Sequence, residues 1–92
     1  IDSSTTATKA QLVDAGGNVV AIASSEYDYE TPQPLWSEQD PELWWTATTS
    51  AVASVLREAG VSGSDVAAIG LTGQMHCLVL LDEGGNVLRP SI

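Results

Sequence analysis

Apolar residues in this chain come in short runs that are separated by polar turns. The runs Lys9–Val13 and Val19–Ser25 have the length and the apolar content of β-strands. Between them, Asp14–Asn18 contains two adjacent glycines, which readily adopt the positive φ angles that hairpin turns require. Ile1–Asp2 is interpreted as the end of a further, buried strand. The pattern therefore predicts that the chain begins with three strands in an antiparallel meander.

The spacing of apolar residues then changes to that of a helix. Glu26–Gln39 contains two prolines, which exclude a regular helix or a central strand, so a loop is predicted there. Asp40 is a good N-cap, Pro41 suits the first helical position, and Gly60 is a good left-handed C-cap. Apolar residues recur at spacings of three and four between these caps: Leu43, Trp44, Ala47, Ala51, Val52, Val55, Leu56 and Ala59. One long helix is predicted from Pro41 to about Ala59.

A second group of strands is predicted after this helix. Val66–Leu71 is almost entirely apolar, as is typical of a strand that is buried on both faces. Because it follows a helix, a right-handed parallel connection is expected. Cys77–Leu81 and Val87–Leu88 are predicted to form a further hairpin, whose turn Asp82–Asn86 nearly repeats Asp14–Asn18. The predicted fold is α/β with a mixed sheet, and its order of elements matches the ribonuclease H-like half of the actin-type ATPase fold.

Composition and charge narrow the classes of function. A chain of 92 residues forms at most one small domain, and its apolar fraction of 43% is too high for a disordered chain. The net charge of −9 disfavours nucleic acid and anionic membranes as partners. No apolar run is long enough to span a membrane, and a single cysteine fits a reducing cytoplasm. Both ends look truncated, so we expect open sheet edges that lead to a marginal fold or to a homo-oligomer.

Two polar turns contain the candidate chemistry. Gly70–Cys77 holds the only His, Met and Cys of the chain, and it follows a predicted buried strand, where binding sites commonly lie. The second turn, Asp2–Lys9, is expected to lie opposite the Gly70–Cys77 turn. Asp2 stands at a strand end before small hydroxyl residues, so it can hold a hydrated Mg²⁺ while backbone N–H groups meet phosphate oxygens. The alternative is an aspartate that caps its own turn, and the spacing alone favours this alternative.

The order of the motifs resembles that in the FGGY family of carbohydrate kinases, in the form seen in xylulokinases. Asp2–Lys9 resembles the first phosphate motif of the family, and Pro34–Trp45 resembles the segment that leads into its first helix. Gly73–His76 resembles the substrate turn, and Leu88–Ile92 the approach to the next sugar-contacting segment. The resemblance covers the whole chain, residues 1–92, but only the first part of the family's N-terminal domain.

The resemblance implies roles for particular side chains. It implies that Asp2 supports catalysis and binds Mg²⁺, and that the catalytic base is an aspartate beyond Ile92. It further implies that Thr5, Thr6 and Lys9 contact the phosphates of ATP, and that Gln74, Met75 and His76 contact the sugar. The alternatives from the residues alone are an ordinary hydroxyl-rich turn, a solvated lysine, a histidine satisfied by the backbone and a methionine that fills a gap.

The implied reaction is the ATP-dependent phosphorylation of D-xylulose to D-xylulose 5-phosphate by a longer protein, with this chain inactive alone. The alternatives are a kinase for sedoheptulose or ribulose, and a non-catalytic sugar-binding domain of the same fold. Two residues depart from the family, because Ser4 and Cys77 stand where glycine is usual. If the turn requires a positive φ at Cys77, strain is expected there.

Aromatic and acidic residues before the helix have structural explanations. Trp44 is predicted in the core, and Trp36 and Trp45 are expected to hold the proline-rich loop against the helix rather than to stack on a sugar. The carboxylates in residues 38–42 are explained by the preference for negative charge at a helix start. Cys77 is predicted to be a small buried apolar residue and not a nucleophile, because no cationic neighbour is evident in the sequence.

Overall fold

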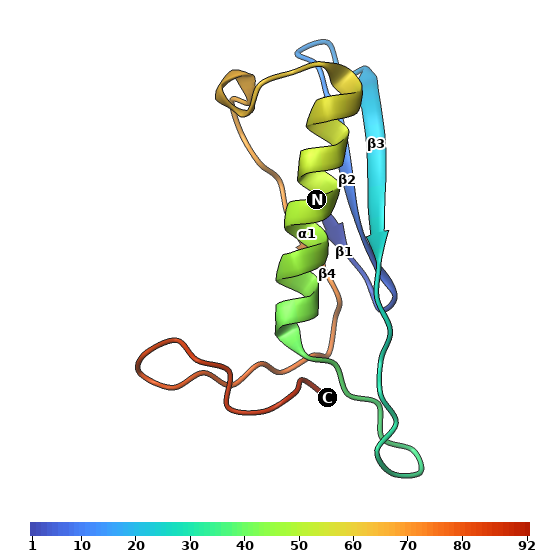
Figure 1. The fold of residues 1–92 in the computed structure, drawn as a ribbon, viewed down its shortest axis with the longest axis vertical. Helices are drawn as coiled ribbons and strands as arrows, with labels where there is room; N and C mark the ends of the chain where they lie inside the picture. Colours follow the sequence, from blue (N-terminus) through green and yellow to red (C-terminus); the bar gives the residue numbers. More distant parts are fainter.

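The computed structural model describes residues 1–92, in which one long helix packs against a small mixed sheet (Figure 1). The strands are β1 (Asp2–Ser3), β2 (Ala7–Val13), β3 (Val19–Glu26) and β4 (Thr72–Gly73), and the helices are α1 (Pro41–Ala59) and the 3₁₀ helix η1 (Gly63–Asp65). The strand order is β3-β2-β1-β4. The pairs β3–β2 and β2–β1 are antiparallel, and the pair β1–β4 is parallel. The predicted mixed α/β architecture is confirmed.

The hairpin β2–β3 forms because one aspartate closes its turn. Asp14 Oδ1 accepts hydrogen bonds from the backbone N–H groups of Gly16 and Asn18, both at 2.9 Å. Gly17 has a φ of 83°, a conformation that most side chains disfavour. β2 begins two residues before the predicted start at Lys9 and β3 ends one residue after the predicted end at Ser25.

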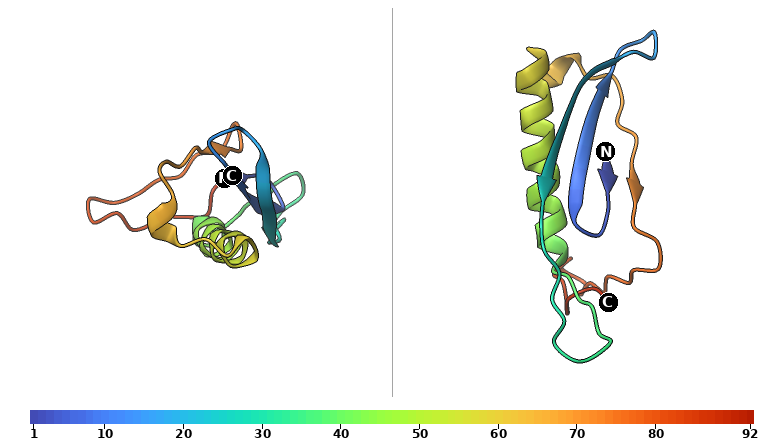
Figure 2. Two further views of the ribbon diagram at one scale, coloured as in Figure 1. Left: turned by 90° about the horizontal axis from the view of Figure 1, so that it is seen from above. Right: turned by 90° about the vertical axis from the view of Figure 1, so that its right-hand side faces the viewer.

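Helix α1 has the predicted bounds and caps. Asp40 Oδ1 accepts a hydrogen bond from the backbone N–H of Glu42 at 3.0 Å, and Pro41 is the first helical residue. At the other end, Gly60 is in the left-handed conformation with a φ of 65°. Figure 2 shows α1 running along the sheet on one of its two faces. The caps therefore fix where the helix begins and ends over the sheet.

The core between α1 and the sheet is small and is built mainly from short side chains. Its buried apolar residues are Ala10, Ala47, Ala51 and Val55. Three of these, Ala10, Ala51 and Val55, form one cluster, and the partly buried residues that pack on it are Leu12, Ala21, Ala23, Val52 and Leu56. An apolar groove of about 730 Å³ lies between α1, β2 and residues 61–70, so much of the apolar surface there is not in contact with protein.

The parallel strand lies later in the sequence than predicted. Val66–Leu71 was expected as a buried strand, but the parallel strand is Thr72–Gly73, and Ile69 and Leu71 are 70% and 77% exposed. Gly70 O accepts a hydrogen bond from the N-terminal amine of Ile1 at 2.9 Å, and Thr72 N donates to Ile1 O at 2.9 Å. With Thr72 opposite Asp2, residues 66–69 have no residue of β1 opposite them. An apolar run becomes a strand only where a neighbour supplies hydrogen bonds.

The second predicted hairpin has its turn but not its strands. Asp82 Oδ1 accepts hydrogen bonds from Gly84 N at 2.8 Å and Asn86 N at 2.9 Å, which repeats the first turn. Beyond the turn there is a single bridge, Leu81 to Val87, in place of the strands predicted at 77–81 and 87–88. The segment extends away from the helix (Figure 1), so no further strand pairs with it.

The overall shape is elongated. The radius of gyration is 15.2 Å, whereas a compact domain of this length has a radius of about 12 Å. Both the long proline-containing loop and the 78–90 segment extend beyond the layers of helix and sheet (Figure 1). None of the helices combines the length and the apolar character that crossing a membrane requires.

Candidate functional site

The two polar turns predicted to face each other are joined by a hydrogen bond. β1 and β4 are parallel neighbours, so their carboxyl ends lie at the same edge of the sheet. From this edge, Gln74 Nε2 donates a hydrogen bond to Thr5 Oγ1 at 3.0 Å. The bond connects residues that are 69 positions apart in the sequence. The structure therefore brings the Asp2–Lys9 turn and the Gly70–Cys77 turn together at one place.

Asp2 and Lys9 occupy directly opposite positions in the β1–β2 ladder. Side chains at such positions lie on the same face of the sheet, close enough to interact. Both side chains are exposed, and neither forms an ion pair in the structure. Because the adjacent Ala10 is buried against α1, Lys9 points to the other face of the sheet. A carboxylate and an ammonium group are thus available side by side on the open face.

The turn after Asp2 is not closed by its carboxylate. Ser4 closes it instead, since Ser4 N and Ser4 Oγ both donate to Ala7 O, at 2.9 Å and 3.0 Å. The Asp2 carboxylate makes no hydrogen bond, so the interpretation of Asp2 as a turn-capping residue does not describe this structure. Ser4 also has a negative φ, because the only non-glycine residues with positive φ are Leu35 and His76. The backbone conformation at position 4 therefore does not require glycine.

Tyr27, which was not predicted from the sequence, stabilises this turn through hydrogen bonds. Tyr27 Oη donates to Ser4 O at 2.6 Å and lies 3.1 Å from Ser3 Oγ and 3.3 Å from Thr8 Oγ1. Its backbone N–H donates to Thr6 O at 3.0 Å. Tyr27 comes from the loop after β3, so it ties this loop to the turn. No local sequence signal identifies such a contact, because it spans 23 positions.

Gln39 is a second residue that sequence reasoning missed, and it is only 6% exposed. Its Nε2 donates to Thr5 O at 2.6 Å and to Asp28 O at 3.1 Å, and its Oε1 accepts from Trp44 Nε1 at 2.9 Å. Its backbone exchanges hydrogen bonds with Ser91 at 2.9 Å and 2.8 Å. Gln39 thus connects the Thr5 turn, the loop, α1 and the C-terminal segment. In the sequence, the only indication of a special role for Gln39 is its position directly before the N-cap Asp40.

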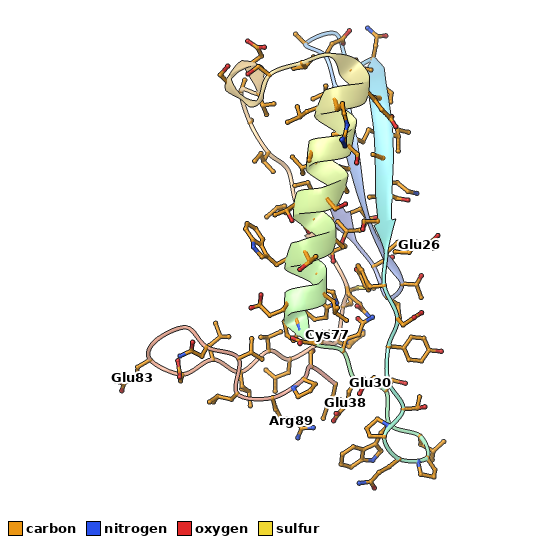
Figure 3. All side chains as sticks on the ribbon, viewed as in Figure 1. Glu26, Glu30, Glu38, Cys77, Glu83 and Arg89 are labelled. Atoms are coloured by element: carbon orange, nitrogen blue, oxygen red, sulfur yellow. The ribbon has the colours of Figure 1, made fainter.

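The tryptophans and carboxylates near the helix start differ partly from expectation. Trp44 is half-buried as part of the Gln39 network, in agreement with a structural role. Trp36 and Trp45 are 43% and 65% exposed, and the loop is held instead by the Gln39 network. Glu38 forms an ion pair with Arg89 (Figure 3), so its role is to hold the C-terminal segment rather than to favour the helix start.

The predicted sugar-binding side chains are all exposed. Met75 is 79% exposed and fills no gap, and the His76 imidazole makes no hydrogen bond, so neither alternative structural role is observed. The turn requires no positive φ at Cys77, so Cys77 carries no such strain; the residue of this turn with a positive φ is His76, at 64°. Cys77 is half-buried and lies near the beginning of α1 (Figure 3). Met75 and His76 are therefore accessible and unpaired, whereas Gln74, although exposed, is hydrogen-bonded to Thr5.

The electrostatics of the site come from few groups. The pKa values that are clearly shifted belong to Asp14 and Asp82, in the two distant hairpin turns. The chain has no cluster of three or more His, Cys, Asp or Glu side chains that could hold a metal ion. Chemically, Thr5 and Gln74 meet at the carboxyl edge of β1 and β4, Asp2 and Lys9 lie opposite each other on the open face, and the single imidazole of His76 is exposed on the turn after β4. This set suits binding of a hydroxyl-bearing ligand and of an anion beside it.

Comparison with known proteins first identifies the class. The chain aligns with a xyloylose kinase of known structure from Brucella ovis at a TM-score of 0.94 and 42% identity, which covers 99% of this chain and 19% of that one. Residues 1–92 match the FGGY family of carbohydrate kinases, N-terminal domain, and the chain therefore belongs to this family.

The individual relatives include a xylulose kinase and a glycerol kinase. The chain is 44% identical over 92 residues to the xylulose kinase of Escherichia coli (strain K12), covering 100% of this chain and 19% of the relative. It is also 37% identical over 83 residues to the glycerol kinase of Burkholderia cenocepacia (strain HI2424), covering 90% of this chain and 17% of the relative. The chain thus spans about a fifth of the length of these relatives.

Proposed function

We propose that the protein containing this chain transfers the γ-phosphoryl group of ATP to a ketose, D-xylulose, and that residues 1–92 form the first part of its N-terminal domain. The observation that supports the proposal is the Gln74–Thr5 hydrogen bond, because it joins the turn that we propose to bind the sugar to the turn that we propose to bind the phosphates. Phosphoryl transfer requires the acceptor hydroxyl and the phosphates to be held next to each other.

On the phosphate side, Thr5, Thr6 and Lys9 contact ATP, and Asp2 holds a hydrated Mg²⁺. Mg²⁺ typically keeps several waters and binds through one or two carboxylates together with substrate phosphates, so a single free carboxylate fits this role. When bound, the ion supplies charge stabilisation to the transferred group. Lys9 lies opposite Asp2 in the ladder and adds positive charge where the net charge of the chain is unfavourable for ATP.

On the sugar side, Gln74 and His76 hydrogen-bond hydroxyl groups and Met75 packs against the carbon face. All three residues are exposed, so their side chains are accessible to a ligand, which supports this assignment. A site that pairs hydroxyl groups rejects ligands that lack them, because its own polar groups would remain unpaired. The catalytic base is proposed to lie beyond Ile92. We also propose a cytoplasmic location, where ATP is available and the single Cys77 stays reduced.

The test is ADP release by the full-length protein on D-xylulose, ribulose, sedoheptulose and glycerol. Glycerol belongs in the panel because a glycerol kinase is among the relatives. The proposal predicts the highest kcat/KM for D-xylulose. A higher kcat/KM for glycerol would show that the three-carbon substrate is the natural one. ADP release with none of the four would instead support a non-catalytic sugar-binding protein.

A further inference from the structure

The turn between β1 and β2 is held through its carbonyl groups by the loop that joins β3 to α1. Three successive carbonyl oxygens accept hydrogen bonds from two residues of this loop: Ser4 O from Tyr27 Oη at 2.6 Å, Thr5 O from Gln39 Nε2 at 2.6 Å, and Thr6 O from Tyr27 N at 3.0 Å. The backbone of the turn is therefore fixed by contacts that are distant in the sequence.

The same peptide groups leave two backbone N–H groups free. In a planar trans peptide, the N–H of one residue points away from the carbonyl oxygen of the residue before it. Because Ser4 O and Thr5 O face the loop, the N–H groups of Thr5 and Thr6 are turned away from it. Neither N–H makes a hydrogen bond within the chain, and both residues are exposed. Successive free N–H groups are typical of backbone concavities that bind anions.

Gln39 is the buried member of this arrangement. Its Nε2 donates to both Thr5 O and Asp28 O, and its Oε1 accepts from Trp44 Nε1 at 2.9 Å. These partners determine the orientation of the amide, because a carbonyl oxygen only accepts and an indole N–H only donates. Gln39 is 6% exposed, so it affects a ligand of this turn through Thr5 rather than by contact.

We propose that Gln39 is a positioning residue for phosphoryl transfer, which holds the Thr5–Thr6 peptide so that the Thr6 N–H faces the phosphate oxygens. This inference rests on the proposed function and extends it, because it names a residue that keeps the phosphate side in shape. Donors that are fixed in advance stabilise developing negative charge without reorganisation during the reaction. Tyr27 holds the preceding peptide in the same way, through Ser4 O.

The main experiment replaces Gln39 by methionine in the full-length protein. Gln39→Met keeps the length of the side chain and removes both donors. Gln33→Met, at an exposed position of the same loop whose side chain makes no hydrogen bond, is the matched control. We expect kcat for ADP release on D-xylulose to fall by about tenfold or more, the effect of one lost hydrogen bond to a charged group. The dissociation constant for D-xylulose, measured by calorimetry, should change by no more than about twofold.

A second variant separates positioning from a purely structural role. Trp44→Phe removes the donor to Gln39 Oε1 and leaves the bond from Gln39 to Thr5. It should lower the urea midpoint, as Gln39→Met does, but change kcat by less than about threefold. A purely structural role predicts that kcat follows the urea midpoint in both variants. If Gln39→Met does not fold, Tyr27→Phe, with Tyr29→Phe as its control, should lower kcat without weakening sugar binding.

The outcomes separate this inference from the proposed function. A folded Gln39→Met protein with the kcat of wild type would overturn the inference, and normal ADP release by wild type would leave the proposed function intact. Equal losses in kcat and in D-xylulose affinity would also overturn it, because the effect would not be confined to the phosphate side. No ADP release by wild type with any of the four acceptors would overturn both.

Discussion

At the scale of single residues, three residues of the proposed site have side chains that the protein does not use for its own stability. The Asp2 carboxylate, the Lys9 ammonium group and the His76 imidazole are exposed and make no hydrogen bond within the chain. The backbones of Asp2 and Lys9 are held by the β1–β2 ladder, and His76 lies in the turn that follows β4. Such residues can be replaced with little change in the free energy of unfolding, so their variants report on function.

Replacing Asp2 tests its proposed role directly. In the full-length protein, we expect Asp2→Ala to lower kcat by about 100-fold or more, because charge stabilisation of the transferred group is lost. The dissociation constant for the sugar, measured by calorimetry, should change by no more than about twofold, since sugar contacts come from the other turn. Glu83→Gln, at the exposed tip of the second hairpin turn, is the control. Equal losses in turnover and sugar affinity would argue against this assignment.

Tyr27 provides a test of how the phosphate-side turn is held. Tyr27→Phe removes the hydroxyl that donates to Ser4 O at 2.6 Å, and we expect a loss of about 1 kcal/mol in the free energy of unfolding. Tyr29→Phe is matched chemically, and its hydroxyl makes no hydrogen bond within the chain, so it should leave stability unchanged. Urea unfolding of the full-length protein measures both. Identical effects of the two substitutions would show that the Tyr27 contact does not stabilise the turn.

At the scale of elements, the sequence predicted correctly those elements that are formed by contacts between residues close together in the chain. The Asp40 and Gly60 caps determined α1, and the Asp-x-Gly-Gly-Asn pattern determined both hairpin turns. The prediction of a strand at Val66–Leu71 was wrong, because a strand needs a neighbouring strand for its hydrogen bonds. The register between β1 and β4 leaves residues 66–69 unpaired. Tyr27 and Gln39 could not be found from sequence because their contacts span 23 and 34 positions. The two polar turns were found because their residue types are chemically distinctive.

The two hairpin turns predict a dependence of stability on pH. The backbone N–H of Asn18 is the main cause of the lowered pKa of Asp14, and the Asn86 side chain is the main cause for Asp82. A carboxyl whose pKa is lower in the folded state stabilises the fold above its ordinary value of 3.8, and this contribution is lost as the pH falls through the lowered value. Asp14→Asn should therefore lower Tm at about pH 7 and have a progressively smaller effect as the pH falls below 3.8. If the Tm difference between wild type and Asp14→Asn did not depend on pH, the charged Asp14 carboxylate would not be the cause of the stabilisation.

At the scale of the whole molecule, the elongated shape and the small core limit what residues 1–92 do alone. Only four apolar residues are buried, and an apolar groove of about 730 Å³ borders α1. Folded domains typically have free energies of unfolding of about 5–15 kcal/mol, which rest largely on buried apolar surface. This chain spans about a fifth of the length of the relatives it matches.

The isolated chain is therefore expected to be weakly stable and inactive. We predict a free energy of unfolding below about 5 kcal/mol, or self-association, together with no ADP release on D-xylulose. Urea unfolding and light scattering after size-exclusion chromatography measure the first two properties. A monomer that unfolds cooperatively with a higher free energy would show that the small core is sufficient. Measurable turnover by this chain would place the catalytic base within residues 1–92.

The central claim is that the Gly70–Cys77 turn holds the sugar and the Asp2–Lys9 turn holds the phosphates. Steady-state kinetics of the full-length protein with His76→Ala and Lys9→Met test this division most directly. We predict that His76→Ala raises KM for D-xylulose by about tenfold or more with KM for ATP unchanged, as expected for one lost hydrogen bond to an ionisable group. Lys9→Met should raise KM for ATP and leave KM for D-xylulose unchanged. An increase in KM for ATP in His76→Ala, with KM for D-xylulose unchanged, would contradict the account.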